Sequence, residues 1–278
     1  FRYEYQGGVW IDLEQPSREE IQQIAHEFSL SERIEKELVS PTPIPLVASD
    51  DNMTLLVLHF PVHGTENDET KSQEIDFVVG SHFILTVRYE VIAPLHHLKK
   101  QLETRQIMAP HALITADVLF EILFVHLYTS VRDHINHVVD QLTHVERDMF
   151  NGSERTAVRL ISSISHQFLH IEAALADQEE PLGRFLLALK PRKFFHTSFA
   201  ERTEHILAER TQIARLVTTY RAVAGELRET NSALLSAKQN EIIKILTVVS
   251  CIFLPLALIA KIFAMKVEYM PFVDDPNG

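Results

Sequence analysis

Cysteine and glycine are scarce in this sequence, and their scarcity excludes several kinds of site. The 278 residues contain one cysteine, which rules out a disulfide within the chain and any zinc module built from paired cysteines. The 8 glycines cannot be assembled into GxGxxG or a Walker-type GxxxxGK loop, the loops that cradle nucleotide phosphates. No nucleophile–base pair stands out either. We therefore expect neither an enzyme nor an organic cofactor.

Basic residues are also in the minority. Lys and Arg total 26 against 38 Asp and Glu, for a formal net charge of −12. Because no long block of Lys and Arg occurs, we do not expect nucleic acid as a partner. The sequence begins at Phe1 with neither an initiator methionine nor a signal peptide, and we expect it to be a fragment of a longer chain.

Strand and helix signals alternate over residues 1–110 and predict an N-terminal α/β domain. Ser17 is followed three residues later by Glu20, the spacing of a capping box at a helix start. Two apolar runs flank Gly80 and Ser81, which predicts an antiparallel hairpin with a two-residue type II′ turn. No chemical motif stands out here, and a scaffold role is the simplest interpretation.

Residues 111–197 carry helix signals only. Apolar residues recur at helical spacing over 117–150, and Gly152 marks a natural helix end. A second helix is predicted from 153 to about 178, with Pro181 as its interruption.

One very long helix is predicted from 198 to 265, a length of about 100 Å at 1.5 Å per residue. Its stalk part, 198–244, has apolar or aromatic residues every seven positions, and Leu216 and Val223 begin a second row. The first row consists of Phe199, Ile206, Ile213, Tyr220, Leu227 and Leu234. This repeat predicts packing against neighbouring helices.

Residues 245–265 predict a transmembrane helix. The run from Ile245 to Ala260 has no charged residue, and Lys244 and Lys261 bound it. Extended to Met265, it reaches about 31 Å, which matches a bilayer core. A buried helix of a soluble protein is the competing interpretation. Since no export signal precedes it, we expect the N-terminal side to be cytoplasmic.

The segment from Asn240 to Ala260, followed by Glu268-Tyr-Met-Pro271, closely resembles the first membrane helix and external loop of CorA magnesium channels. The resemblance implies an α+β fold, in which a cytoplasmic α/β funnel domain precedes long helices and the last helix is a stalk that continues into the membrane. It also implies a homopentamer in the lipid bilayer of the plasma (inner) membrane. Such a channel would carry Mg²⁺, or also Co²⁺ and Ni²⁺, and intracellular Mg²⁺ would gate it.

This sequence departs from the family's Gly-Met-Asn signature, since the same stretch reads Ala264-Met265-Lys266 and Lys261 stands where glycine is common. The external loop is expected at 266–278, and the family's second membrane helix is missing before the sequence stops. Asparagine carbonyls can accept hydrogen bonds from the waters of Mg²⁺, whereas lysine only donates and repels a cation. Our hypothesis is that the chain as written does not pass Mg²⁺.

The resemblance also implies roles for particular residues. Asn240 would offer carbonyl oxygens to the ion, Glu229 would form an acidic ring, and the apolar positions would be constrictions that gate by dewetting. The implied pathway consists of Glu229, Asn240, Ile243, Leu246, Leu254, Ala264, Met265 and Lys266. Glu201, Glu204 and Glu209 are candidates for regulatory Mg²⁺ sites. A solvated helix face is the alternative for Glu229 and these three, and stalk packing is the alternative for Asn240.

Two other functions stay open. His166 and His170 are four residues apart on a predicted helix, a spacing that can chelate zinc. If they do, a zinc transporter similar to ZntB is the runner-up; otherwise they are surface or packing histidines. A non-conducting scaffold or regulatory fragment, anchored by one helix, is the third interpretation.

Overall fold

The structure is a computed structural model that describes residues 1–50, 52–63, 70–108, 114–191, 195 and 198–264. Within these residues, six strands form one sheet in the order β1-β2-β6-β5-β4-β3. The strands are β1 (Arg2–Tyr5), β2 (Gly8–Glu14), β3 (Leu46–Ser49), β4 (Thr54–His63), β5 (Thr70–Val79) and β6 (Phe83–Arg88). The pair β2–β6 is parallel, and the other neighbours are antiparallel.

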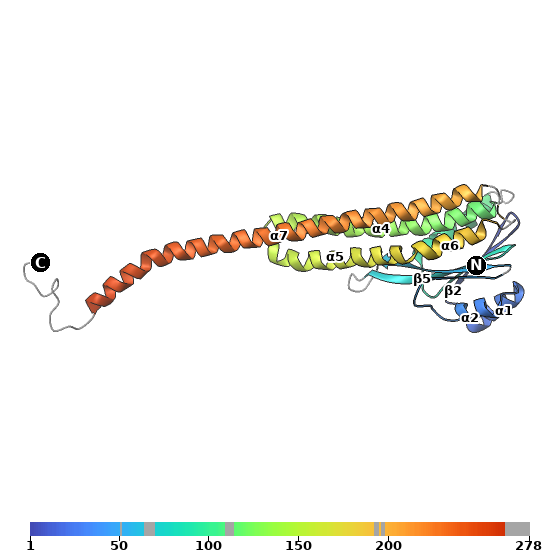
Figure 1. Ribbon diagram of the computed structural model, residues 1–278, viewed down its shortest axis with the longest axis horizontal. Helices are drawn as coiled ribbons and strands as arrows, with labels where there is room; N and C mark the ends of the chain where they lie inside the picture. Colours follow the sequence, from blue (N-terminus) through green and yellow to red (C-terminus); the bar gives the residue numbers. More distant parts are fainter. Residues whose placement is uncertain (51, 64–69, 109–113, 192–194, 196–197, 265–278) are drawn as a thin grey trace, which may run out of the picture.

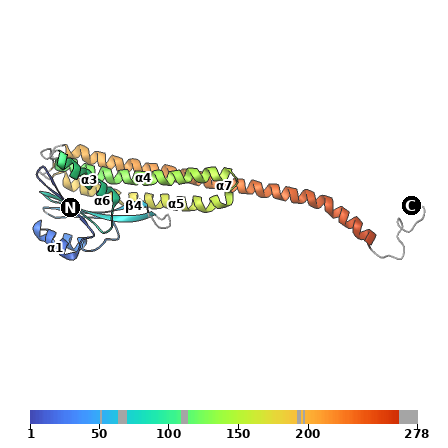
Figure 2. The same ribbon diagram turned by 180° about the vertical axis from the view of Figure 1, so that it is seen from behind.

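Helices cover both faces of the sheet, as Figures 1 and 2 show. The helices α1 (Arg18–Glu27) and α2 (Glu32–Leu38) pack on one face. The other face shares a core with the remaining helices, which are α3 (Ala93–Met108), α4 (Ala116–Phe150), α5 (Glu154–Asp177), α6 (Glu179–Leu189) and α7 (Phe199–Ala264). The period-2 alternation of a strand divides β4 between the two cores, so that Leu56 and Leu58 face the long helices while Leu55 and Val57 face α1 and α2.

Local signals at helix and strand ends have mixed outcomes. The capping box is confirmed, because Ser17 Oγ accepts from the Glu20 N–H and the Glu20 carboxylate accepts from the Ser17 N–H. The antiparallel pairing of β5 with β6 is also confirmed. The type II′ turn at Gly80 and Ser81 is wrong: Gly80 lacks the positive φ that this turn needs, and its N–H donates to the Phe83 carbonyl at 3.0 Å, so the two loop residues are Ser81 and His82. The need for glycine at position 80 is steric, because a Cβ there would lie 2.2 Å from the Phe83 ring.

The helices α4 and α5 form a long antiparallel hairpin. As predicted, the first ends just before Gly152, whose φ of +102° is left-handed and suits glycine. The other end of the hairpin is fixed to the sheet through Gln178, which is fully buried between α5 and α6. Its amide accepts from the Tyr128 hydroxyl at 3.0 Å and donates to the His59 carbonyl at 2.6 Å. The predicted interruption at Pro181 is wrong in position, since the helices break at Gln178 and Pro181 lies in the first turn of α6, where a proline is tolerated.

The stalk helix α7 packs along this hairpin through a heptad pattern. The predicted row is confirmed: Phe199, Ile206, Ile213 and Leu227 are buried, and Tyr220 and Leu234 pack partly buried against the same core. The predicted second row is confirmed at Leu216, which packs partly buried against the core, and is wrong at Val223, which is 43% exposed. The buried second row lies one position later and contains polar residues. It consists of Thr203, Arg210, Val217, Ala224 and Asn231.

Beyond the hairpin, α7 continues alone. Figure 1 shows it as one continuous, gently curving helix that leaves the end of α4 and α5. Its 66 residues correspond to about 100 Å. Pro255 lies inside it and cannot donate the backbone hydrogen bond that would otherwise reach Cys251.

Candidate ion pathway and the helices that position it

The free end of α7 is predominantly apolar on all sides, and no other described residue covers it. Its exposed apolar side chains include Ile245, Leu246, Val248, Val249, Ile252, Phe253, Leu254, Leu256, Leu258, Ile259, Ile262 and Phe263. Of the described residues, only α7 contains a helix long and apolar enough to cross a membrane, and none of its apolar window is buried. Among the described residues this segment has no core to occupy, which favours a membrane helix over the alternative of a buried helix in a soluble globule.

Four of the predicted pathway positions share one face of α7, since at about 100° per residue they fall within a sector of about 60°. They are Glu229, Asn240, Ile243 and Leu254, and all four are exposed. The buried residues Leu227 and Asn231 lie about 160° from Glu229 on either side of the helix. Along the packed stalk the predicted pathway face thus points away from the hairpin that holds α7, and beyond the stalk Ile243, at one edge of this face, also lines the hollow beside the start of α5.

The other predicted positions fit this face less well. In a straight helix Leu246 and Ala264 lie about 100° from Glu229, and a supercoil with 3.5 residues per turn would bring both closer to the shared face. Met265 and Lys266, with the predicted loop 266–278, lie outside the described residues.

Polar contacts fasten the last packed turns of α7 to the start of α5. Asn231 donates from its amide to the Glu154 carbonyl at 3.0 Å. Lys238 Nζ lies 2.6 Å from Glu154 Oε1, and its hydrogen bond lowers the pKa of the Glu154 carboxyl. These contacts stand between the sheet domain and the first apolar residues of the span, so they set the direction in which α7 leaves the hairpin.

A second ionic cluster holds the opposite end of α7. Arg202 donates to Asp117 Oδ2 at 2.8 Å and also pairs with Glu121, while Ser198 donates to Asp117 at 2.7 Å. Burial alone would raise the pKa of Asp117, but hydrogen bonds from Thr115, Ser198 and Arg202 outweigh it and hold the pKa at about 2. The carboxylate is therefore charged at neutral pH, and it fixes the first turn of α7 to α4.

The candidate regulatory residues do not form one site. Glu201 and Glu204 are exposed on α7. Glu209 is already engaged by Arg132, whose Nη2 lies 2.8 Å from its carboxylate. The histidines His166 and His170 are exposed on α5. Among the residues with described positions, no group of three His, Cys, Asp or Glu side chains is arranged to hold a metal ion.

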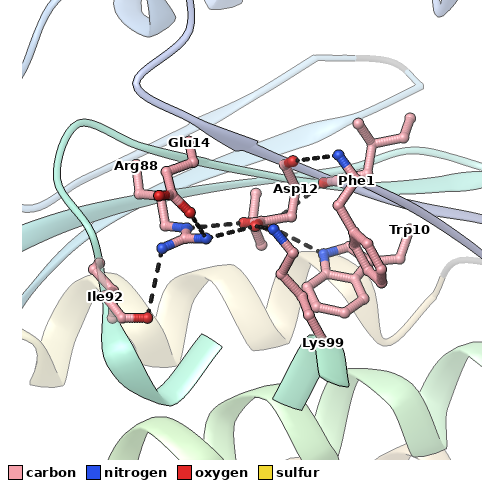
Figure 3. A network of polar contacts seen from close by, with 9 residues as sticks. Phe1, Trp10, Asp12, Glu14, Arg88, Ile92 and Lys99 are labelled. Carbon is pink, nitrogen blue, oxygen red and sulfur yellow. Dashed lines mark hydrogen bonds and ion pairs between the residues drawn. The ribbon is translucent and has the colours of Figure 1, made fainter. Parts of the chain in front are cut away.

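Sequence reasoning missed a buried network under the sheet, which Figure 3 shows. Arg88 on β6 is fully buried and donates to Asp12 Oδ2 on β2 at 2.9 Å and to Glu14. Lys99 of α3 lies 3.2 Å from the same Asp12 oxygen. Trp10 donates to Thr86, which donates in turn to Asp12. The network joins the parallel strand pair to α3, and the only sequence signal for it is charge in otherwise apolar strands.

A model of one known protein family matches the sequence of this chain. The model of the CorA-like Mg²⁺ transporter protein family matches residues 5–278, nearly the whole chain. The chain belongs to this family. The family is one of divalent-cation transporters, and the chain's α+β fold with a long terminal helix agrees with that membership.

Individual relatives cover almost the same residues as the family model. The cobalt/magnesium transport protein CorA of Methanocaldococcus jannaschii is 23% identical over 277 residues, which span 97% of this chain and 83% of that protein. The complete structure of the CorA magnesium transporter from the same organism superposes with a TM-score of 0.80 at 21% identity, over 98% of this chain and 84% of that one. The structure of full-length CmaX has a TM-score of 0.73 at 17% identity, over 98% and 81%. These structures confirm the predicted fold.

Proposed function

We propose that this protein transports divalent metal cations, with Mg²⁺ as the principal ion, as a subunit of a homopentamer in the plasma (inner) membrane. In this arrangement the sheet domain lies in the cytoplasm and α7 carries the pathway through the bilayer. The relatives named as magnesium and cobalt transport proteins support the choice of ion. Mg²⁺ and Co²⁺ are cargo here, and the function needs no organic cofactor and no catalytic residue.

The observation that carries the proposal is the division of α7 into two faces. One face packs on α4 and α5 along the stalk, while the opposite face, with Glu229, Asn240 and Leu254, is held away from the rest of the chain. An apolar helix that is exposed to lipid needs no further partner. Acidic and amide side chains on the same helix face as apolar ones instead favour contact with water, which a pathway on an axis between several copies would provide. Asn240 would accept hydrogen bonds from the waters of a passing ion, and Ile243 and Leu254 would close the pathway when it dewets.

Lys266 is expected to control the rate at which Mg²⁺ enters the outer mouth of the pathway. A ring of ammonium groups repels a divalent cation and offers no acceptor to its waters, whereas a ring of asparagine amides does the reverse. We therefore expect the chain as written to carry little Mg²⁺. A Lys266→Asn variant is expected to carry more, because the substitution removes one positive charge per subunit and supplies a carbonyl oxygen.

The test is metal influx into proteoliposomes that contain a Mg²⁺-sensitive dye, with the purified chain and with Lys266→Asn at equal protein density. The proposal expects the variant to admit Mg²⁺ several-fold faster than the chain as written. A matched control, Lys190→Asn, changes a lysine on the soluble side and leaves influx unaltered. Equal Mg²⁺ influx through the chain and Lys266→Asn would contradict the role given to position 266.

The same vesicles separate the alternatives. If a Zn²⁺ dye responds and the Mg²⁺ dye does not, and if His166→Ala with His170→Ala abolishes the response, the zinc transporter replaces the present proposal. If neither metal enters although the assembly is intact, the non-conducting scaffold replaces the present proposal. Regulation by Mg²⁺ at Glu201, Glu204 and Glu209 stays a prediction, and binding of Mg²⁺ to the assembled protein that is lost in Glu201→Gln with Glu204→Gln would support it.

A further inference from the structure

The tip of the α4–α5 hairpin carries an exposed aromatic side chain near the start of the apolar segment. Phe150, the last residue of α4, is 62% exposed. Two residues later, a Cβ on Gly152 would lie 4.0 Å from Lys238 Nζ, so the turn is level with Lys238 on α7. Because Lys238 precedes Ile245 by seven residues, the turn lies about 10 Å below the first residue of the apolar run.

That distance is close to the depth of a lipid headgroup layer. A bilayer of about 40–45 Å with a hydrocarbon core of about 30 Å leaves about 5–8 Å of headgroups on each side. Phe is one of the apolar side chains that peripheral segments bury about 5–10 Å into the boundary between headgroups and acyl chains. An α7 that crosses the bilayer from Ile245 therefore brings the turn to the outer edge of the headgroup layer, about 2–5 Å beyond it.

The charges around the tip also suit a membrane surface. Over 146–159 and 238–244 there are five basic and four acidic residues, so this end is not acidic, although the whole chain has a net charge of −12. Between the tip and α7 lies an open hollow of about 940 Å³, lined by Arg155, Lys238 and Ile242 among others. Glu154 also lines the hollow and pairs with Lys238, so Arg155 and the apolar Ile242 are the groups that the hollow offers to a phosphate attached to acyl chains.

We propose that the tip of the α4–α5 hairpin docks on the headgroup layer of the leaflet that α7 enters, with Phe150 among the headgroups and Arg155 beside lipid phosphates. The proposal rests on the proposed function only in that α7 spans the bilayer. Since the hairpin is fastened to α7 at Glu154, this contact would brace the stalk against the membrane. The protein would then contact the membrane at two places, the apolar segment of α7 and the tip of the hairpin, and both contacts would fix the orientation of the stalk.

The test places a fluorescent reporter at the tip of the full-length chain in lipid vesicles. Trp10 is the only tryptophan and is fully buried, so it contributes a constant background. We compare Phe150→Trp with Leu169→Trp, a 45% exposed position on α5 about 25 Å farther from the membrane. The vesicles contain phospholipids with a nitroxide on the headgroup, a short-range quencher. The proposal expects several-fold stronger quenching at 150 than at 169.

A third reporter separates this proposal from the proposed function. Phe253→Trp lies in the middle of the apolar run and reports spanning through quenching by acyl-chain nitroxides. If 253 is quenched and 150 is quenched no more than 169, the span stands and the docking proposal is overturned. If 150 is shielded with a blue-shifted emission in every lipid, a second copy covers the tip and the docking proposal is again overturned. If 253 is not quenched, both proposals fail.

Discussion

The buried network around Arg88 gives a sharp prediction about what holds the sheet domain together. The change is Arg88→Met, which keeps the length of the side chain and removes the guanidinium from a site with no solvent exposure. Three interactions disappear: those with Asp12 and Glu14, and a 3.5 Å hydrogen bond to the Ile92 carbonyl at the start of α3.

The structure fixes the expected size of the effect. Removing one partner of a buried ion pair costs about 3–5 kcal/mol, because the other charge stays buried without compensation. Here Lys99 stays 3.2 Å from Asp12, and Glu14 is exposed enough to turn toward water. The lower end of the range therefore applies, about 3 kcal/mol. In the double variant with Lys99→Met, Asp12 loses both of its side-chain cations, so we expect the loss to exceed the sum of the two single losses by about 1 kcal/mol or more.

The assay is thermal unfolding followed by tryptophan fluorescence, because Trp10 belongs to the same network through Thr86. A loss of about 3 kcal/mol corresponds to a fall in Tm of about 6–12 °C for a domain of this size. The matched control is Arg184→Met, which breaks only an exposed pair with Glu180 and is expected to change stability by about 0.5 kcal/mol or less. An Arg88→Met protein as stable as that control would refute the reasoning.

Further predictions concern pH and the pathway. Burial, with the nearby Glu74 carboxylate, raises the pKa of Asp76, so the folded state retains a proton that the unfolded state has lost, and stability falls as pH rises above about 4. Asp76→Asn should abolish this slope in unfolding scans between pH 4 and 8 and raise the Tm at neutral pH; an unchanged slope would contradict it. The depressed pKa of Asp117 has the opposite sign, so its contribution is present above pH 4 and disappears as pH falls towards 2, and Arg202→Met should reduce that acid-dependent loss in the same scans, because the hydrogen bonds from Thr115 and Ser198 stay. Ile243→Asn should make a dewetted constriction wet and increase cation leak through proteoliposomes, while a leak equal to that of the unchanged chain would contradict its place in the pathway.

Much of the fold was predictable because its signals are local or periodic. The capping box at Ser17 needs only four consecutive residues, and the heptads of α7 repeat one apolar position along a single helix. The end of α4 before Gly152 follows from the conformational freedom of glycine. These features depend little on the rest of the molecule, and the structure confirms them.

The features that were missed depend on distant partners or on polar residues in buried positions. The second heptad row contains Arg210 and Asn231, which are buried because backbone carbonyls of Leu175 and Glu154 accept their hydrogen bonds. A hydropathy pattern places such residues at the surface. The pair of Asp12 with Arg88 joins strands 76 residues apart, and no spacing rule connects them. The helix α3 also went unpredicted, although Leu95, Leu98 and Leu102 have helical spacing.

The candidate pathway was named through resemblance, and the structure adds its placement on α7. The sequence alone did not distinguish the face of α7 that packs on the hairpin from the face that is free, since both contain apolar and charged residues. That distinction requires the positions of α4 and α5. The boundaries at 110 and 197 and the roles of the individual pathway residues stay predictions.

The central claim is that the free face of α7 lines an axis shared by several copies, and cysteine cross-linking in lipid vesicles tests it most directly. With Cys251→Ser as background, Asn240→Cys places a thiol on the predicted pathway face and Ile242→Cys places one toward the hairpin, where Ile242 lines the hollow beside α5. The account predicts that a short bifunctional thiol reagent links Asn240→Cys chains into covalent dimers and leaves Ile242→Cys chains single. Equal linking of the two variants, or linking of Ile242→Cys alone, would contradict it.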